Sequence, residues 1–245
     1  MMKSVLSDFT KRGFFRLIKP FENSTDDLIK ITRAFGIALK THVEEFRDES
    51  KIEPFINHPL KVALVISEEL HLHNADLVCA ALLHDMRLKN DAELKQDFGE
   101  VIHDIVHFVA IPTIRNEERV KTLDEYFYSI ANSSLLIRYL ILADRLENVR
   151  ALKNGTQKNK ILRYKEETQK YIIPIAEKTD ENIVFKLSIA LYELNDLVFR
   201  RLYLFGFCLY EFTIGKDRQL AATTNGILEN ACNNNLSTLT KCEIR

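Results

Sequence analysis

Residues 135–152 read LLIRYLILADRLENVRAL, a long stretch whose apolar side chains recur at helical spacing. Asp144 and Asn148 interrupt the apolar positions four residues apart, so they share one face of the predicted helix. A carboxylate at a position where a buried helix favours an apolar side chain needs a compensating partner. The pattern therefore predicts a helix, capped by Ser133, that carries Asp144 into the interior to meet such a partner.

Further helical patterns precede and follow this stretch. They predict helices over residues 26–46, 58–70, 77–84, 98–109, 117–129, 160–177 and 181–205. The chain of 245 residues has only 7 Gly and 5 Pro, too few for the frequent turns of a sandwich or barrel. We therefore expect an all-α fold: an N-terminal segment over 1–25, a helical domain over 26–212 and a polar tail of disordered type over 213–245.

Composition and charge exclude several classes of protein. The 34 basic side chains balance 35 acidic ones, so no overall field attracts a nucleic-acid polymer or an anionic membrane. No stretch approaches the roughly 20 apolar residues of a membrane span, and the first residues do not resemble a signal peptide. The four cysteines lie far apart without a CxxC pair, which argues against a zinc knuckle or a disulfide framework. We expect a cytoplasmic protein that binds a small molecule.

Four side chains stand out as candidate metal ligands: His58, His84, Asp85 and Asp144. His58 opens a predicted helix, and the His84-Asp85 pair follows the apolar run VCAALL. Each residue alone has an ordinary structural explanation as a cap, a hydrogen-bonding group or an ion-pair partner. Together they supply two imidazoles and two carboxylates, which suit Mn²⁺, Fe²⁺, Zn²⁺ or Mg²⁺ and leave coordination positions for water and phosphate oxygens.

The sequence around these residues resembles the HD hydrolase domain of RelA/SpoT-type proteins and small alarmone hydrolases. The matching segments are HPLKVA (58–63), AALLHD (80–85), FG (98–99), LADRLENVR (142–150), ET (167–168) and YIIPIA (171–176). The resemblance implies an HD-domain helical bundle that binds one divalent ion, Mn²⁺ in the first place. It also implies an enzyme of the stringent response that removes the 3′-pyrophosphate from the alarmones guanosine tetra- and pentaphosphate, (p)ppGpp.

The resemblance also assigns individual residues. It makes His58, His84, Asp85 and Asp144 the metal ligands, places a base-stacking arginine at Arg47 and places a polar contact to the nucleotide at Asn148. Arg87 and Lys89 have two open interpretations, a solvated charged loop or a clamp for the pyrophosphate. The apolar stretch over 202–212 either packs on the bundle or forms a homodimer contact.

At Leu88-Lys89 the chain departs from the family pattern, which has a Glu-Asp pair that positions or activates the attacking water. A general base of this kind contributes about 10²- to 10⁴-fold to the rate. Three alternatives are open. Asp91 or Glu93 replaces the pair, the chain hydrolyses another nucleotide or phosphoester, or it is an inactive binder of nucleotide or metal that regulates a partner.

Overall fold

Helix α4 (Ala75–Leu83) lies in the middle of the fold, and every residue from Leu77 to Leu83 is buried. Its first turn is capped by Asn74, whose Oδ1 accepts a hydrogen bond from the amide of Leu77 at 2.9 Å. The helices that contact α4 are α2 (Thr25–Thr41), α3 (Asn57–Leu64), α6 (Glu100–Val109) and α8 (Leu135–Ala151). Because neighbours surround α4, apolar residues are favoured on most of its faces.

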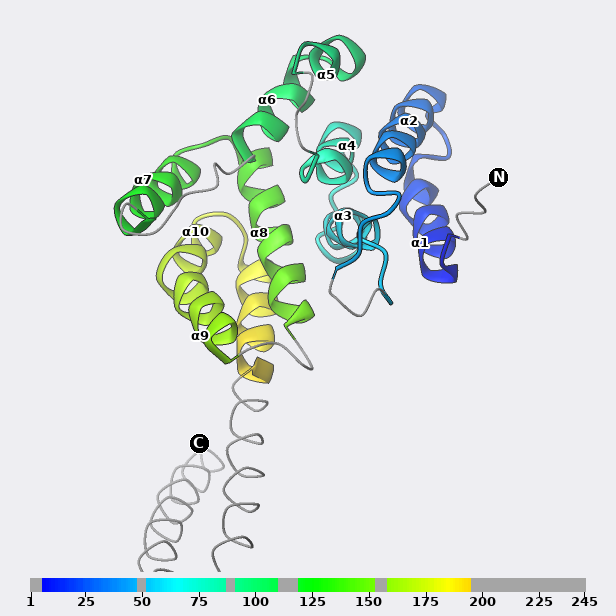
Figure 1. Cartoon of the computed structure of the whole chain (residues 1–245). Helices are drawn as coiled ribbons and strands as arrows, with labels where there is room; N and C mark the ends of the chain where they lie inside the picture. The colour runs from blue at the N-terminus through cyan, green and yellow to red at the C-terminus, as the bar shows by residue number, and fades with distance from the viewer. Residues whose placement is uncertain (1–5, 48–51, 87–90, 110–118, 153–157, 195–245) are drawn as a thin grey trace, which may run out of the picture. The chain divides into compact units, whose positions relative to one another are not determined.

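The computed structural model describes residues 6–47, 52–86, 91–109, 119–152 and 158–194, with the backbone alone at 91–93 and 119–122. These residues belong to one compact unit that ends at Leu194 (Figure 1). Its other helices are α1 (Asp8–Ile18), α5 (Asp91–Phe98), α7 (Arg119–Ala131), α9 (Lys158–Glu167), α10 (Ile173–Glu177) and one over residues 181–194. A short 3₁₀ turn over Lys19–Phe21 follows α1, and π-helical turns extend α3 over Val65–Glu69 and join α9 to α10 over Thr168–Ile172.

The predicted all-α class is confirmed. Among the described residues, the only extended pairing outside helices is an isolated antiparallel bridge between Phe46 and Pro54. None of the helices in this part of the chain is long and apolar enough to cross a membrane. The predicted boundary between residues 212 and 213, the tail and the apolar stretch over 202–212 all lie outside the described residues.

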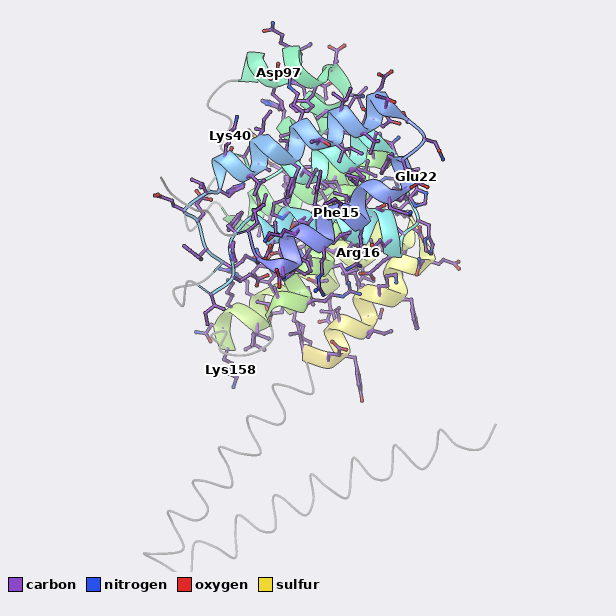
Figure 2. All side chains as sticks on the ribbon, turned by 90° about the vertical axis from the view of Figure 1, so that its right-hand side faces the viewer. Phe15, Arg16, Glu22, Lys40, Asp97 and Lys158 are labelled. Atoms are coloured by element: carbon purple, nitrogen blue, oxygen red, sulfur yellow. The ribbon has the colours of Figure 1, made fainter. Side chains whose placement is uncertain are left out.

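Helix α1 is not predicted by the sequence pattern, because its buried face is mostly small or polar. That face consists of Thr10, Gly13 and Leu17. Phe15, a large apolar residue of the same helix, points outward and is 70% exposed (Figure 2). The absence of a side chain at Gly13 lets α1 approach α3: a Cβ there would lie 3.0 Å from Cδ2 of Leu60. Thr10 donates a hydrogen bond to Oδ1 of Asn57 at 2.6 Å, which fixes the first turn of α3.

Several predicted helix bounds shift in the structure, and a start and a cap differ for a clear local reason. Gly99 has a φ of +84°, a left-handed conformation that favours glycine, so the predicted helix over 98–109 begins only at Glu100. The preceding helix α5 buries only Leu94 and Phe98 among its described side chains, too few for a clear pattern. The cap of α8 is Ser134 and not Ser133, since Oγ of Ser134 accepts from the amide of Ile137 at 3.4 Å.

Candidate metal centre

Three packed helices bring the predicted metal ligands together. His58 is the second residue of α3, His84 and Asp85 directly follow α4, and Asp144 lies in the middle of α8. Helices α3, α4 and α8 contact one another and lie side by side in Figure 1. Side chains carried by packed helices are held more firmly than side chains carried by loops.

The side-chain distances are those of a compact cluster. Nε2 of His58 lies 3.2 Å from Oδ2 of Asp85 and 3.2 Å from Oδ1 of Asp144, and Nε2 of His84 lies 3.5 and 3.6 Å from the same oxygens. Both histidines are buried, whereas the carboxylates of Asp85 and Asp144 are 34% and 28% exposed. The centre is therefore accessible to solvent from the side of its carboxylates.

Three of the clustered residues fit a divalent ion, because one ligand atom each of His58, His84 and Asp144 lies within 4.8 Å of the other two. Asp85 lies beside both imidazoles. Ligand atoms around an ion with bonds of about 2.1 Å stand about 3.0 Å apart in octahedral geometry and about 3.4 Å apart in tetrahedral geometry. The four distances above lie close to this range. Nε2 of His84 is buried and has no hydrogen-bond partner in the described part of the chain. A ligated ion would satisfy this atom, which otherwise carries the cost of an unpaired polar group.

Hydrogen bonds fix both imidazole rings. Nδ1 of His84 faces the carbonyl oxygen of Ala81 at 2.7 Å, and Nδ1 of His58 faces Oε2 of Glu147 at 2.5 Å. Because both partners only accept, each Nδ1 carries the proton and donates. The neutral form of each ring therefore presents the lone pair of Nε2 to the centre, as a metal ligand requires.

The metal-free cluster is an array of opposite charges. Burial disfavours a charged His58 ring, but hydrogen bonds to Asp144, Asp85 and Glu147 outweigh burial and raise its pKa to about 11. Burial also opposes charge on His84, yet the neighbouring carboxylates raise its pKa. Although burial acts in the other direction, the two imidazoles lower the pKa of Asp85 and of Asp144. His58 is therefore protonated at neutral pH when no ion is present.

Metal binding is expected to release protons. A ligating imidazole must be neutral, so each ion bound near neutral pH displaces at least the proton of His58, whose metal-free pKa is about 11. The affinity for Mn²⁺ should rise about tenfold per pH unit for each proton released, and should fall as the pH falls. Isothermal titration calorimetry in buffers of different ionisation enthalpy measures this release. Binding without proton release would contradict the assignment of His58.

Asn148, one of the two predicted nucleotide contacts, lies next to the cluster. Its Nδ2 donates to Oδ1 of Asp144 at 2.6 Å, one helical turn earlier in α8. Its Oδ1 accepts from Nη2 of Arg47 at 3.5 Å. Since Arg47 can only donate and the carboxylate can only accept, the orientation of the Asn148 amide is fixed.

Arg47, the other predicted contact, is held against α8 from a neighbouring segment. Its amide donates to the carbonyl oxygen of Glu53 at 3.0 Å, beside the bridge between Phe46 and Pro54. Its Nη2 donates to Oε2 of Glu147 at 2.5 Å, and its guanidinium carbon lies 5.9 Å from the ring centre of Phe55. The guanidinium group therefore contacts Glu147 and Asn148, each of which contacts a member of the cluster.

Glu147 and Tyr126 adjoin the cluster and are not assigned by the sequence. Glu147 is 4% exposed and contacts His58 and Arg47. Its sequence signal is the three-residue spacing from Asp144, which places both on one helix face. Burial and the charge of Asp144 raise the pKa of Tyr126, so this phenol of α7 is near the same carboxylate. No local spacing predicts this electrostatic effect, because the two residues belong to different helices.

The remaining predicted site residues lie outside the part of the chain whose side chains are described. Arg87 and Lys89 lie outside the described residues, and so do the side chains of Asp91 and Glu93, whose backbone forms the first turn of α5. Their roles stay predictions.

Comparison with known proteins identifies the family. A family model described as HD domain matches residues 34–180, a stretch that contains all four clustered residues. The chain belongs to the HD-domain family. This match confirms the family predicted from the sequence. The names of the relatives described next agree with the predicted resemblance to hydrolases.

Two curated relatives show how much of this HD-domain chain aligns with known proteins. It is 31% identical over 136 residues to the guanosine-3′,5′-bis(diphosphate) 3′-pyrophosphohydrolase MESH1 of Xenopus tropicalis, covering 54% of this chain and 74% of that protein. It is 32% identical over 179 residues to the guanosine-3′,5′-bis(diphosphate) 3′-pyrophosphohydrolase of Aquifex aeolicus, covering 71% of this chain and 24% of that protein. The chain thus spans most of the animal relative and about a quarter of the bacterial one.

A solved structure supports the HD-domain fold. It was described as a metazoan ortholog of SpoT that hydrolyzes ppGpp, and it superposes with a TM-score of 0.59 at 22% identity. The match covers 67% of this chain and 94% of the other. At this identity the likeness bears on the fold alone.

Proposed function

We propose that this HD-domain protein is a metal-dependent hydrolase that removes the 3′-pyrophosphate from guanosine tetra- and pentaphosphate. The observation that carries the proposal is the cluster of His58, His84, Asp85 and Asp144 on three packed helices. The substrate is inferred from the animal relative, a named 3′-pyrophosphohydrolase of which the chain covers 74% at 31% identity.

The four clustered residues are assigned as ligands of one divalent ion, with Mn²⁺ as the proposed metal and Fe²⁺, Zn²⁺ or Mg²⁺ as alternatives. When bound, such an ion lowers the pKa of a water molecule and neutralises charge on the phosphoryl group under attack. The chain itself supplies orientation. Ala81 and Glu147 hold the two imidazole rings, and Asn148 holds one oxygen of Asp144.

Arg47 and Asn148 are assigned to the nucleotide. The Arg47 side chain is 18% exposed and permanently charged, so it can present its guanidinium group to a base or a phosphate from beside the metal centre. Arg87 and Lys89 are assigned to the pyrophosphate, and Asp91 or Glu93 to the attacking water. A cytoplasmic location and a homodimer remain predictions from the sequence.

Turnover of guanosine tetraphosphate tests the proposed function. Purified protein with Mn²⁺ should convert each nucleotide and one water into guanosine diphosphate and pyrophosphate. Chelation of the metal should stop the reaction, and guanosine triphosphate, which lacks a 3′-pyrophosphate, should not release pyrophosphate from that position. Turnover of only other nucleotides would favour a different phosphohydrolase, and nucleotide binding without any turnover would favour a regulatory binder.

A further inference from the structure

We propose that Glu147 is a positioning residue that couples the nucleotide-binding arginine to the metal centre, because one carboxylate oxygen holds both Arg47 and His58. The inference rests on the proposed function, since it gives Glu147 a role within the same site. It concerns a residue that neither ligates the proposed ion nor belongs to the predicted nucleotide contacts.

The contacts of Glu147 support this role. Its Oε2 accepts from Nδ1 of His58 at 2.5 Å and from Nη2 of Arg47 at 2.5 Å. Its other oxygen lies 4.0 Å from Nζ of Lys61. A carboxylate that is 4% exposed is stable only when donors satisfy it, and here the donors are an imidazole and a guanidinium group with separate roles in the site.

The two donors belong to different parts of the fold. His58 opens α3, whereas Arg47 lies next to the bridge between Phe46 and Pro54, and Glu147 is on α8. An acceptor on Nδ1 of His58 keeps Nε2 directed at the centre and makes the ring a stronger ligand. The same acceptor fixes the position of the Arg47 guanidinium group, so loss of Glu147 should affect metal binding and nucleotide binding together.

The side chains around Glu147 form a closed ring. Arg47 donates to Asn148 at 3.5 Å, Asn148 donates to Asp144 at 2.6 Å, and Oδ1 of Asp144 lies 3.2 Å from Nε2 of His58. The two contacts of Glu147 connect His58 back to Arg47. Arg47 therefore reaches the proposed ligands along two routes, one through Glu147 to His58 and one through Asn148 to Asp144.

Glu69 provides a matched control, because it is an ion-paired carboxylate that contacts α8 through Arg150 and not through Glu147. Its carboxylate accepts from Arg150 at 2.7 and 3.1 Å and lies 3.2 Å from Nζ of Lys186. It is half-buried and ion-paired, and in the described part of the chain it makes no hydrogen bond or ion pair with a proposed ligand or with Arg47. Glu69→Gln therefore removes a paired carboxylate without altering the ring.

The main test is calorimetry of Mn²⁺ binding to the metal-free protein. It compares the Glu147→Gln and Glu69→Gln variants with the unchanged chain. Glutamine keeps the size of the side chain but removes its charge. Its NH₂ group takes the place either of Oε2, which accepts from both donors, or of the oxygen that lies 4.0 Å from Lys61. We expect the Kd of Glu147→Gln for Mn²⁺ to rise about 10- to 100-fold. Glu69→Gln should keep the Kd of the unchanged protein.

Kinetics test the coupling to Arg47. At saturating Mn²⁺, Glu147→Gln should raise KM for guanosine tetraphosphate, and Arg47→Ala should raise it as well. Because both changes disrupt the same contact, the double variant should raise KM by less than the product of the two single effects. A purely structural role for Glu147 would give independent, multiplicative effects on KM.

A thermal melt of each variant separates these effects from misfolding. If Glu147→Gln does not fold, Glu147→Asp is tested in its place. Aspartate keeps the charge but is one methylene shorter, so this variant should weaken Mn²⁺ binding measurably. The loss should be smaller than the loss expected for a neutral side chain. Folded Glu147 variants that bind Mn²⁺ as the Glu69→Gln control does would overturn the inference. If the unchanged protein itself binds no Mn²⁺, the proposed metal centre fails first and the inference fails with it.

Discussion

Replacement of Asp144 by asparagine is expected to lower kcat by at least about 10³-fold, because it removes the most connected carboxylate of the metal centre. Oδ1 of Asp144 faces His58 at 3.2 Å, His84 at 3.6 Å and Asn148 at 2.6 Å. Asparagine has nearly the same shape, but it leaves the two imidazoles with one carboxylate and removes an anionic ligand from the proposed ion.

Asp124→Asn is the matched control for this change. Asp124 is an exposed carboxylate of α7 that accepts hydrogen bonds from Lys170 and Tyr171. Among the described residues it forms no hydrogen bond or ion pair with a proposed ligand. Steady-state kinetics and the Mn²⁺ content of each purified variant should show a loss in Asp144→Asn alone. An Asp144→Asn variant with unchanged turnover and metal content would rule out Asp144 as a ligand.

Restoring the family's Glu-Asp pair with Leu88→Glu and Lys89→Asp is expected to raise kcat by about 10²- to 10⁴-fold. The chain has neither carboxylate at these positions. If Asp91 and Glu93 do not replace the pair, the attacking water lacks the general base that the resembling enzymes provide. Single-turnover measurements of pyrophosphate release would give the rate of the chemical step. Leu88→Gln with Lys89→Asn is the control, because it changes size and polarity similarly without adding carboxylates.

The same experiment separates the alternatives for the missing pair. If Asp91 or Glu93 already acts on the water, the restored pair should change kcat by less than about tenfold, and Asp91→Asn with Glu93→Gln should lower it instead. If the restored pair creates turnover where the unchanged chain has none, the natural protein is an inactive binder of its nucleotide.

The sequence points to most of the clustered residues because they disrupt a regular pattern, and their role as ligands stays a prediction. Asp144 interrupts an apolar helical stretch, and His84-Asp85 ends a run of residues that is buried throughout α4. Their order along the chain is also the order of the family's motifs. The burial of α4 follows from composition, since an all-apolar helix is stable only among neighbours.

Other features depend on tertiary contacts that local patterns do not encode. Thr10 and Gly13 bury one face of α1 without large apolar side chains, so periodicity does not detect this helix. Glu147 shares a helix face with Asp144, but its partners His58 and Arg47 come from distant parts of the chain. The spacing therefore indicates a buried carboxylate without showing what it holds.

Anomalous X-ray scattering from crystals grown with Mn²⁺ tests the central claim most directly. The expected result is one manganese peak per chain, within about 2.0–2.6 Å of Nε2 of His58, Nε2 of His84 and one carboxylate oxygen each of Asp85 and Asp144. A manganese peak at other residues, or none at these four in protein that hydrolyses guanosine tetraphosphate, would contradict a metal centre built from this cluster.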